Sequence, residues 1–169
     1  MKVEMNYSWL YGASFSASTE LQTMASGWYE NGTEVIFACG GNMFQSVAAA
    51  AAANDGAVVG VDVDQSSQSD TVITSAMKGL SEAVSTSLSD IEAGDWSDIA
   101  ASNGNFGLED GDYVGLPTDA DSWNFETFTT DEYEALKEKI KSGEITVDNS
   151  SDDSTKPTVS EFTTVNYIQ

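Results

Sequence analysis

The sequence predicts an α/β fold, in which a parallel sheet carries helices on both faces. Strand-like and helix-like segments alternate along residues 1–91. The inner strands, residues 34–41 and 57–64, are apolar almost throughout, which is typical of strands buried on both faces. The 169 residues are enough for one domain with a substantial core.

The first strand and the first helix have distinct patterns. Residues 3–11 carry apolar side chains at every second position, as a strand does. Residues 18–30 show helical spacing, with Ser18 as the N-cap and Asn31-Gly32 at the end. The apolar face of this helix consists of Leu21, Met24, Ala25 and Trp28.

The next elements continue the alternation. Residues 34–41 predict a short buried strand that contains Cys39, followed by an alanine-rich helix that ends near Asn54. Residues 57–64 form the next strand, and residues 71–75 form a short one. A helix over residues 76–91 would carry Ala76, Leu80, Ala83, Ser87 and Ile91 along one face.

The last third of the chain has a weaker pattern. Residues 106–116 predict a hairpin with an Asp-Gly turn. Residues 129–143 predict a helix with acids first, lysines last and a glycine stop. Residues 144–147 suggest one more strand. Residues 148–169 are expected to be a polar, flexible tail, although VNYIQ at its end can add an edge strand.

The charge balance excludes several classes of function. There are 28 acids against six lysines, with no arginine or histidine, giving −22. Such a surface repels nucleic acids and anionic membranes, because both are bound through lysine or arginine. Without histidine there is no Ser-His-Asp triad and no histidine metal site, and without arginine there is no bidentate phosphate clamp.

The cysteine count and the apolar runs say little about the cellular compartment of the protein. Cys39 is the only cysteine, so no internal disulfide can form. No stretch reaches the roughly 18 apolar residues of a membrane span. The N-terminus lacks the apolar core of a signal peptide and begins like a strand. From this beginning we expect the chain to be part of a larger protein.

Two acids follow an apolar strand at a place where ligands bind. In open parallel sheets, ligands lie beyond the carboxyl ends of the strands, where Asp62 and the pair Gly40-Gly41 are predicted. Asp62 and Asp64 are two residues apart. Within one strand their side chains would point the same way and could meet one ligand.

Four interpretations of these acids stay open. Two acids can begin a metal site, but no third ligand cluster accompanies them. A DxD after an apolar strand also suggests a phosphatase nucleophile, although Gln65 and Ser66 follow, without the Thr or Val typical of that family. An ionised Asp62 can accept two hydrogen bonds from a vicinal diol, as on a ribose. Finally, both acids can simply end a strand in solvent.

Two further groups are candidates for ligand contact. Gly40, Gly41 and Asn42 open a helix, where backbone N–H groups can reach a ligand, or they form a tight turn. The spacing is not G-x-G-x-x-G, and no Walker lysine follows. Lys78 can donate to a ligand oxygen beside Asp62, or only balance charge.

Phe15 is the aromatic candidate. It lies in a loop of small residues after the first strand, where its ring can stack on a flat ligand or fill the core.

The ordered set GASF, EVIFACGG, GVDVDQ and TSAMK, followed by FGLEDGDYVGL and IKSGEITV, resembles the second lobe of the basic membrane protein family. The resemblance covers about residues 7–145. These are substrate-binding lipoproteins of ABC transporters with a type I periplasmic-binding fold, and they include purine nucleoside receptors. The resemblance implies that residues 1–147 form one lobe, with residues 106–147 packing toward a first lobe.

The resemblance also implies a ligand site. Phe15 matches the aromatic residue that stacks on the purine, Gly41 a backbone contact, Asp62 the carboxylate that binds the ribose hydroxyls, and Lys78 a ligand-binding lysine. Secondary candidates are Gly40, Asn42 and Asp64. The sequence departs from the family where Ser16, Ala17 and Ser18 replace an expected aspartate and where Gly79 replaces a basic residue.

The implied function is solute binding without catalysis, cofactor or metal. The protein is expected to be an extracytoplasmic, lipid-anchored monomer that binds a purine nucleoside and delivers it to an ABC permease. A sensory or regulatory domain of the same fold is the first alternative. A magnesium-dependent phosphatase-like enzyme that uses Asp62 is the second.

Overall fold

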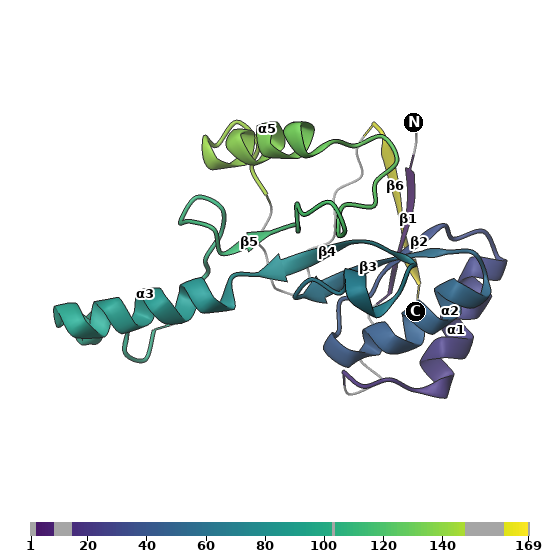
Figure 1. The fold of residues 1–169 in the computed structure, drawn as a ribbon, viewed down its shortest axis with the longest axis horizontal. Coiled ribbons are helices and arrows are strands. Elements are labelled where there is room, and N and C mark those ends of the chain that lie inside the picture. The colour runs from purple at the N-terminus through teal and green to yellow at the C-terminus, as the bar shows by residue number, and fades with distance from the viewer. Residues whose placement is uncertain (1–2, 9–14, 103, 148–160, 169) are drawn as a thin grey trace.

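The computed structural model describes residues 3–8, 15–102, 104–147 and 161–168, with the strands divided between two sheets (Figure 1). The larger sheet has the order β2-β3-β4-β5, and the smaller one pairs β1 with β6. The strands are β1 (Val3–Ser8), β2 (Val35–Phe37), β3 (Ala57–Asp62), β4 (Val72–Lys78), β5 (Val114–Gly115) and β6 (Thr163–Ile168). The helices are α1 (Thr19–Glu30), α2 (Phe44–Ala53), α3 (Leu80–Ala93), α4 (Trp96–Ile99) and α5 (Thr130–Lys141), with short 3-10 helices η2 (Gly41–Met43) and η3 (Ser66–Gln68).

The larger sheet confirms the predicted α/β class. The strands β2, β3 and β4 run parallel, and β5 runs antiparallel to β4. The helices α1 and α2 lie on one side of this sheet and α5 lies on the other (Figure 1). Because three neighbouring strands are parallel, their carboxyl ends meet at one edge, which is the edge where the sequence places the candidate residues.

An apolar core lies between the sheet and the helices α1 and α2. Phe44 and Val58 are fully buried, and Val72 of β4 is nearly so. The Tyr29 hydroxyl donates to the backbone carbonyl of Ala57 at 2.7 Å. Burial raises the pKa of Tyr29 to about 12. This packing fixes β3 and β4, the two strands that carry the site.

The N-terminus of α1 is held as the sequence predicts. The Ser18 side chain accepts a hydrogen bond from the Leu21 N–H at 3.1 Å, which satisfies one of the unpaired donors of the first turn. The Ser46 hydroxyl in α2 donates to the Ser18 carbonyl and accepts from the Ser18 N–H. The start of α1 is therefore tied to α2.

The helix α5 also matches its prediction. Thr129 and Glu132 form a capping box at its N-terminus, and Gly143 beyond its C-terminus has a positive φ of 75°. Tyr133 in the first turn is buried against the body of the protein. This contact places α5 over the end of the larger sheet that holds β5.

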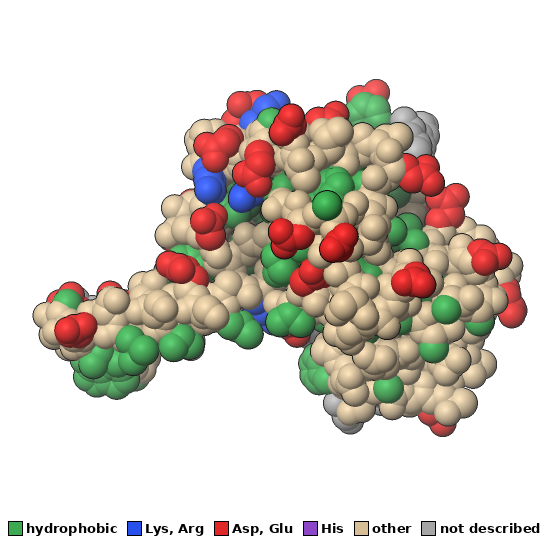
Figure 2. Space-filling view, viewed as in Figure 1, with side chains coloured by type: hydrophobic (Ala, Val, Ile, Leu, Met, Phe, Trp, Pro, Cys, Tyr) green, Lys and Arg blue, Asp and Glu red, His purple; other side chains and the backbone are tan. Residues whose placement is uncertain are grey.

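The helix α3 projects away from the rest of the molecule as an arm (Figure 1). Its apolar side chains gather on one side of that arm in Figure 2, and Leu88 is 61% exposed. The Thr86 hydroxyl on the other side lies 2.9 Å from the Tyr113 hydroxyl, which holds that side toward the body. The exposed stripe consists of Leu80, Val84, Leu88 and Ile91.

Two predicted boundaries near the site were wrong. The strand β3 ends at Asp62 rather than Asp64, because Asp62 has a positive φ of 70° that breaks the extended backbone. The strand β4 continues to Lys78, so Ala76 belongs to it and not to α3. The helix begins only after Gly79, whose N–H donates to the Tyr113 carbonyl at 2.6 Å.

Three other expectations were wrong in detail. Cys39 is exposed rather than buried, because it lies two residues beyond the end of β2, a short strand in which Val35 and Phe37 are exposed as well. Residues 106–116 form turns instead of a hairpin, since β5 pairs with β4. Residues 144–147 form no strand. The edge strand predicted within VNYIQ is present as part of β6, which pairs with β1.

Some predicted segments lie outside the described residues. These are residues 9–11 of the first strand and residues 148–160 of the expected tail.

Candidate functional site

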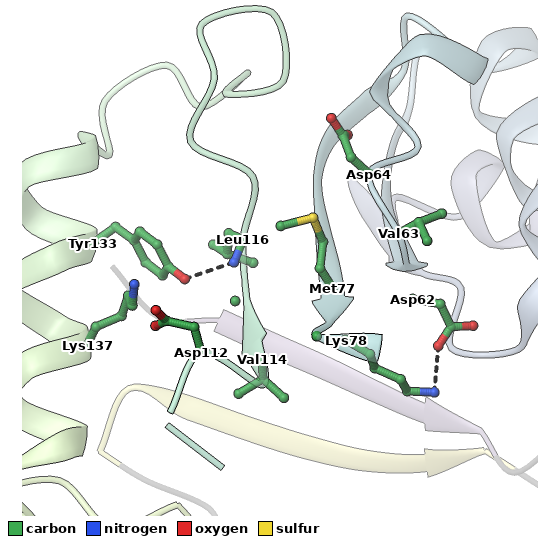
Figure 3. A pocket seen from close by; sticks show the side chains of 12 residues that line it. Asp62, Val63, Asp64, Met77, Lys78, Asp112, Val114, Leu116, Tyr133 and Lys137 are labelled. Atoms are coloured by element: carbon green, nitrogen blue, oxygen red, sulfur yellow. Dashed lines mark hydrogen bonds and ion pairs between the residues drawn. The ribbon is translucent and has the colours of Figure 1, made fainter. Parts of the chain in front are cut away.

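The carboxyl edge of the larger sheet holds an ion pair between two predicted site residues. Asp62 is the last residue of β3, and Lys78 is the last residue of β4. The strand register pairs Asp62 with Met77, so Lys78 lies one position further along the neighbouring strand. The Lys78 Nζ atom is 2.5 Å from Asp62 Oδ1 (Figure 3). The structure therefore brings together the two residues predicted to bind a ligand's polar groups.

The pair is partly open to solvent. The side chain of Asp62 is 35% exposed and that of Lys78 is 61% exposed. The pKa of the Lys78 ammonium is raised, mainly because its side chain is hydrogen-bonded to Asp62. Burial lowers this pKa, whereas the charges of Asp62 and Cys39 raise it further. Asp62 Oδ1 is itself shielded from solvent, so the ammonium is the group that balances its charge.

A cavity of about 360 Å³ adjoins this pair. One wall comes from the ends of β3 and β4, and the other from the β5 region and α5 (Figure 3). Its volume is in the range of small-molecule sites. The lining residues are Asp62, Val63, Asp64, Met77, Lys78 and Gly79 on the first wall, and Asp112, Val114, Gly115, Leu116, Tyr133 and Lys137 on the second.

The second wall contains polar residues that the sequence did not single out. The Tyr133 hydroxyl oxygen accepts a hydrogen bond from the Leu116 N–H at 2.8 Å. The Lys137 ammonium lies 5.4 Å from the centroid of the Tyr133 ring and 3.3 Å from Glu134. The i,i+4 spacing of Tyr133 and Lys137 shows that they share a helix face. However, only the packing of α5 reveals that this face lines the cavity.

Lys137 stays charged in this wall. Burial by itself would lower the pKa of its ammonium, but Glu134, with further contributions from Tyr133 and Asp112, raises it above its ordinary value. The cavity is thus lined by cations and carboxylates from both walls. Such a mixture suits a polar ligand that offers both donors and acceptors.

Asp64 lines the cavity but does not point in the direction of Asp62. Its carboxylate accepts from the Ser122 hydroxyl at 2.6 Å and from the Ser66 N–H at 3.0 Å. Burial opposes ionisation, but these hydrogen bonds lower the pKa of Asp64. Figure 3 shows the two carboxylates pointing apart. The expectation that their side chains point the same way was wrong, because β3 ends at Asp62.

Phe15 and the glycine turn form a second group at the end of β2. The Asn42 N–H donates to the Phe15 carbonyl at 3.1 Å. Gly41 has a φ of +56°, and a β-carbon there would lie 3.7 Å from that same carbonyl. The Phe15 ring is 62% exposed, so it is not a core residue. At Gly40, a β-carbon would collide with the Met43 side chain.

The predicted site residues therefore fall into two groups. Asp62, Asp64 and Lys78 line the cavity, whereas Phe15, Gly40, Gly41 and Asn42 lie beside it at the end of the neighbouring strand.

The described part of the chain offers neither a metal site nor a membrane span. In that part, no group of three or more Cys, Asp or Glu residues is placed to hold a metal ion. No helix within it is long and apolar enough to span a membrane.

The fold and the cavity define the class of this protein as an α/β protein with a cavity at the carboxyl edge of its parallel strands. The model of the Bmp family, described as ABC transporter substrate-binding protein, PnrA-like, matches residues 1–151. Because the match covers most of the chain, the protein belongs to the Bmp family of ABC transporter substrate-binding proteins. The resemblance that the sequence motifs suggested is thereby confirmed. A search of curated proteins found no match.

Proposed function

We propose that this protein binds a purine nucleoside as the solute of an ABC transporter. The observation that carries the proposal is the Asp62 carboxylate, which lies at a small-molecule cavity and is one-third exposed. An ionised carboxylate accepts two hydrogen bonds from vicinal hydroxyls, and hydrogen bonds to charged groups are among the strong ones. A ribose offers such a pair of hydroxyls.

Two further features support a nucleoside rather than a free sugar. The exposed Phe15 ring, on the neighbouring part of the same edge, offers a flat surface for a purine base. The Gly41 backbone, which has no side chain, allows a ligand to approach closely. Lys78 would donate to a ligand oxygen while it stays paired with Asp62.

In this proposal the chain acts as one lobe of a two-lobed receptor. The lobes close on the nucleoside outside the cytoplasmic membrane, and the permease recognises the closed form. A lipid anchor would hold the receptor at the membrane, and it would act as a monomer. None of the site residues has a catalytic role in this scheme.

The test is a titration of the full chain with candidate solutes, in which NMR chemical shifts report binding. A complete site of micromolar affinity is worth about −8 kcal/mol, so one lobe that supplies half of it would bind in the millimolar range. Adenosine, guanosine, inosine, uridine, ribose and galactose form the panel. We expect the purine nucleosides to bind best and to shift the signals of Phe15, Asp62 and Lys78.

Asp62→Ala should weaken nucleoside binding by about 2–3 kcal/mol, because two hydrogen bonds to a charged group are lost. Asp70→Ala is the matched control, since it removes the same charge from an exposed loop. If Asp62→Ala binds as tightly as the parent, the proposal is wrong.

A further inference from the structure

A buried polar cluster lies beside the Asp62–Lys78 pair. It consists of Gly60 in β3, Gln65 in the turn that follows β3, and Ser75 in β4. Gln65 is 8% exposed and Ser75 is fully buried. Buried polar side chains stay stable only when they are hydrogen-bonded, so the contacts of these residues show what the cluster holds in place.

The contacts join the turn to both strands. Gln65 Oε1 accepts from the Val61 N–H at 2.9 Å, one residue before Asp62. The Gln65 N–H donates to Ser75 Oγ at 3.0 Å. The fit around Gly60 is tight, because a β-carbon there would lie 2.6 Å from Ser75 Oγ and 2.8 Å from Gln65 Oε1. Glycine is thus the residue that leaves room for the amide.

The turn held by these bonds has an unusual backbone. Asp62 has a φ of +70°, which a residue with a side chain keeps only where its surroundings hold it. The hydrogen bonds of Gln65 fix the backbone on both sides of Asp62. Through Ser75 they also fix the strand that carries Lys78 three residues later.

We propose that Gln65 is a positioning residue that sets the Asp62 carboxylate against the Lys78 ammonium. Its amide holds the turn in which Asp62 leaves the strand, and its backbone N–H locks that turn to β4. Gln65 touches no ligand in this scheme. The part of the inference that concerns solute binding rests on the proposed function, but the part that concerns the ion pair does not.

The first test is Gln65→Met, which keeps the size of the side chain and removes the acceptor. The readout is the pKa of the Lys78 ammonium, measured in the full chain from the NMR shifts of lysine side-chain carbons. The chain has six lysines, so few signals need to be assigned. The Cys39→Ser background removes the charge of Cys39, which contributes to the raised pKa of Lys78. The other charged groups at the cavity, Asp64, Asp112 and Lys137, stay in place.

In the parent we expect the Lys78 pKa to lie above the ordinary value of about 10.4. In Gln65→Met it should fall back to about that value, while circular dichroism and cooperative melting show that the fold is kept. A folded Gln65→Met protein with an unchanged Lys78 pKa would overturn the inference.

Gln68→Met is the matched control. Gln68 lies three residues further on in η3, is exposed, and accepts a hydrogen bond from Gln45. The same substitution there should leave the Lys78 pKa unchanged, and an equal fall in this control would also overturn the inference. If Gln65→Met does not fold, Ser75→Ala decides, because it removes only the acceptor of the Gln65 N–H. A lower Lys78 pKa in Ser75→Ala supports the inference, and an unchanged one overturns it.

The solute readout separates this inference from the proposed function. Adenosine should bind about tenfold more weakly to Gln65→Met than to the parent, although Asp62 is still present. If adenosine does not bind the parent, the proposed nucleoside function fails, and the Lys78 pKa alone decides the role of Gln65.

Discussion

Asp62 and Lys78 show how a single backbone angle changes the chemistry of a site. The positive φ of Asp62 ends β3 and turns its carboxylate onto the last residue of β4. Exposed ion pairs contribute little to stability, so this pair is better understood as a means of orienting a carboxylate at a cavity. A ligand that shares these groups would find both an acceptor and a donor already in position.

Asp64 has a structural role at the same scale, and its pH dependence follows from its hydrogen bonds. Its folded pKa is lowered, so its contribution to stability is present above the unfolded value of about 3.9 and is lost as the pH falls through the folded value. Asp64→Asn should therefore be less stable than the parent at pH 6, and the difference should shrink as the pH falls below about 4. Urea unfolding at several pH values measures this.

A variant of Ser122, the hydrogen-bond donor to Asp64, checks the cause of that pH dependence. Ser122→Ala removes the same hydrogen bond from the other side, so its loss of stability should also fade in acid. A stability difference that persists undiminished at pH 2 in both variants would contradict the assignment.

Among the elements, the strand β3 and the helix α3 should differ in how much their apolar side chains contribute to stability. The strand β3 is held by a dense core, in which Val58 is fully buried. The helix α3 instead keeps its apolar stripe in solvent and contacts the body through Thr86. Burial is what converts an apolar side chain into stability, so these two elements should respond differently to the same kind of truncation.

Val58→Ala should lower the free energy of unfolding by about 2–3 kcal/mol, because it leaves a cavity in the core. Leu88→Ala removes a larger side chain, but it should cost less than about 0.5 kcal/mol, because Leu88 is exposed. Urea unfolding of both variants at one pH gives the comparison. Equal losses would show that α3 is packed in solution, contrary to this structure.

The same contrast explains which elements the sequence could predict. Apolar runs and helical spacing depend on neighbours in the chain, so they predict β3, α1, α2 and α5 well. The end of β3 was missed because the positive φ of Asp62 lies in a turn whose hydrogen bonds, from Val61 to Gln65 and from Gln65 to Ser75 of the next strand, have no local sequence pattern. The exposure of Cys39 was missed because β2 ends at Phe37, two residues before it, and the apolar run does not show where the strand ends.

At the scale of the whole molecule, the site combines parts that lie far apart in the sequence. The first wall of the cavity was predictable, since the carboxyl ends of parallel strands share one edge. The second wall was not, because it needs α5 to pack Tyr133 against Leu116, which follows β5. The pairing of β1 with β6 joins the two ends of the described chain and has no local signal either.

The distribution of charge also belongs to this scale. The protein carries −22, and Figure 2 shows acids spread over the visible face. Three of the six lysines lie on α5, and Lys78 and Lys137 line the cavity. Of these two, Lys78 pairs with Asp62 and Lys137 with Glu134. This arrangement fits a polar, uncharged solute better than an anion that must approach an acidic surface.

The most direct test of the central claim compares adenosine with 2′,3′-dideoxyadenosine, which lacks the hydroxyls that Asp62 is proposed to bind. Affinities are measured by NMR titration on the parent and on Asp62→Ala. The account predicts that the parent prefers adenosine by about 2–3 kcal/mol and that Asp62→Ala loses most of this preference. Equal affinity of the parent for both ligands, or a preference that survives in Asp62→Ala, would contradict it.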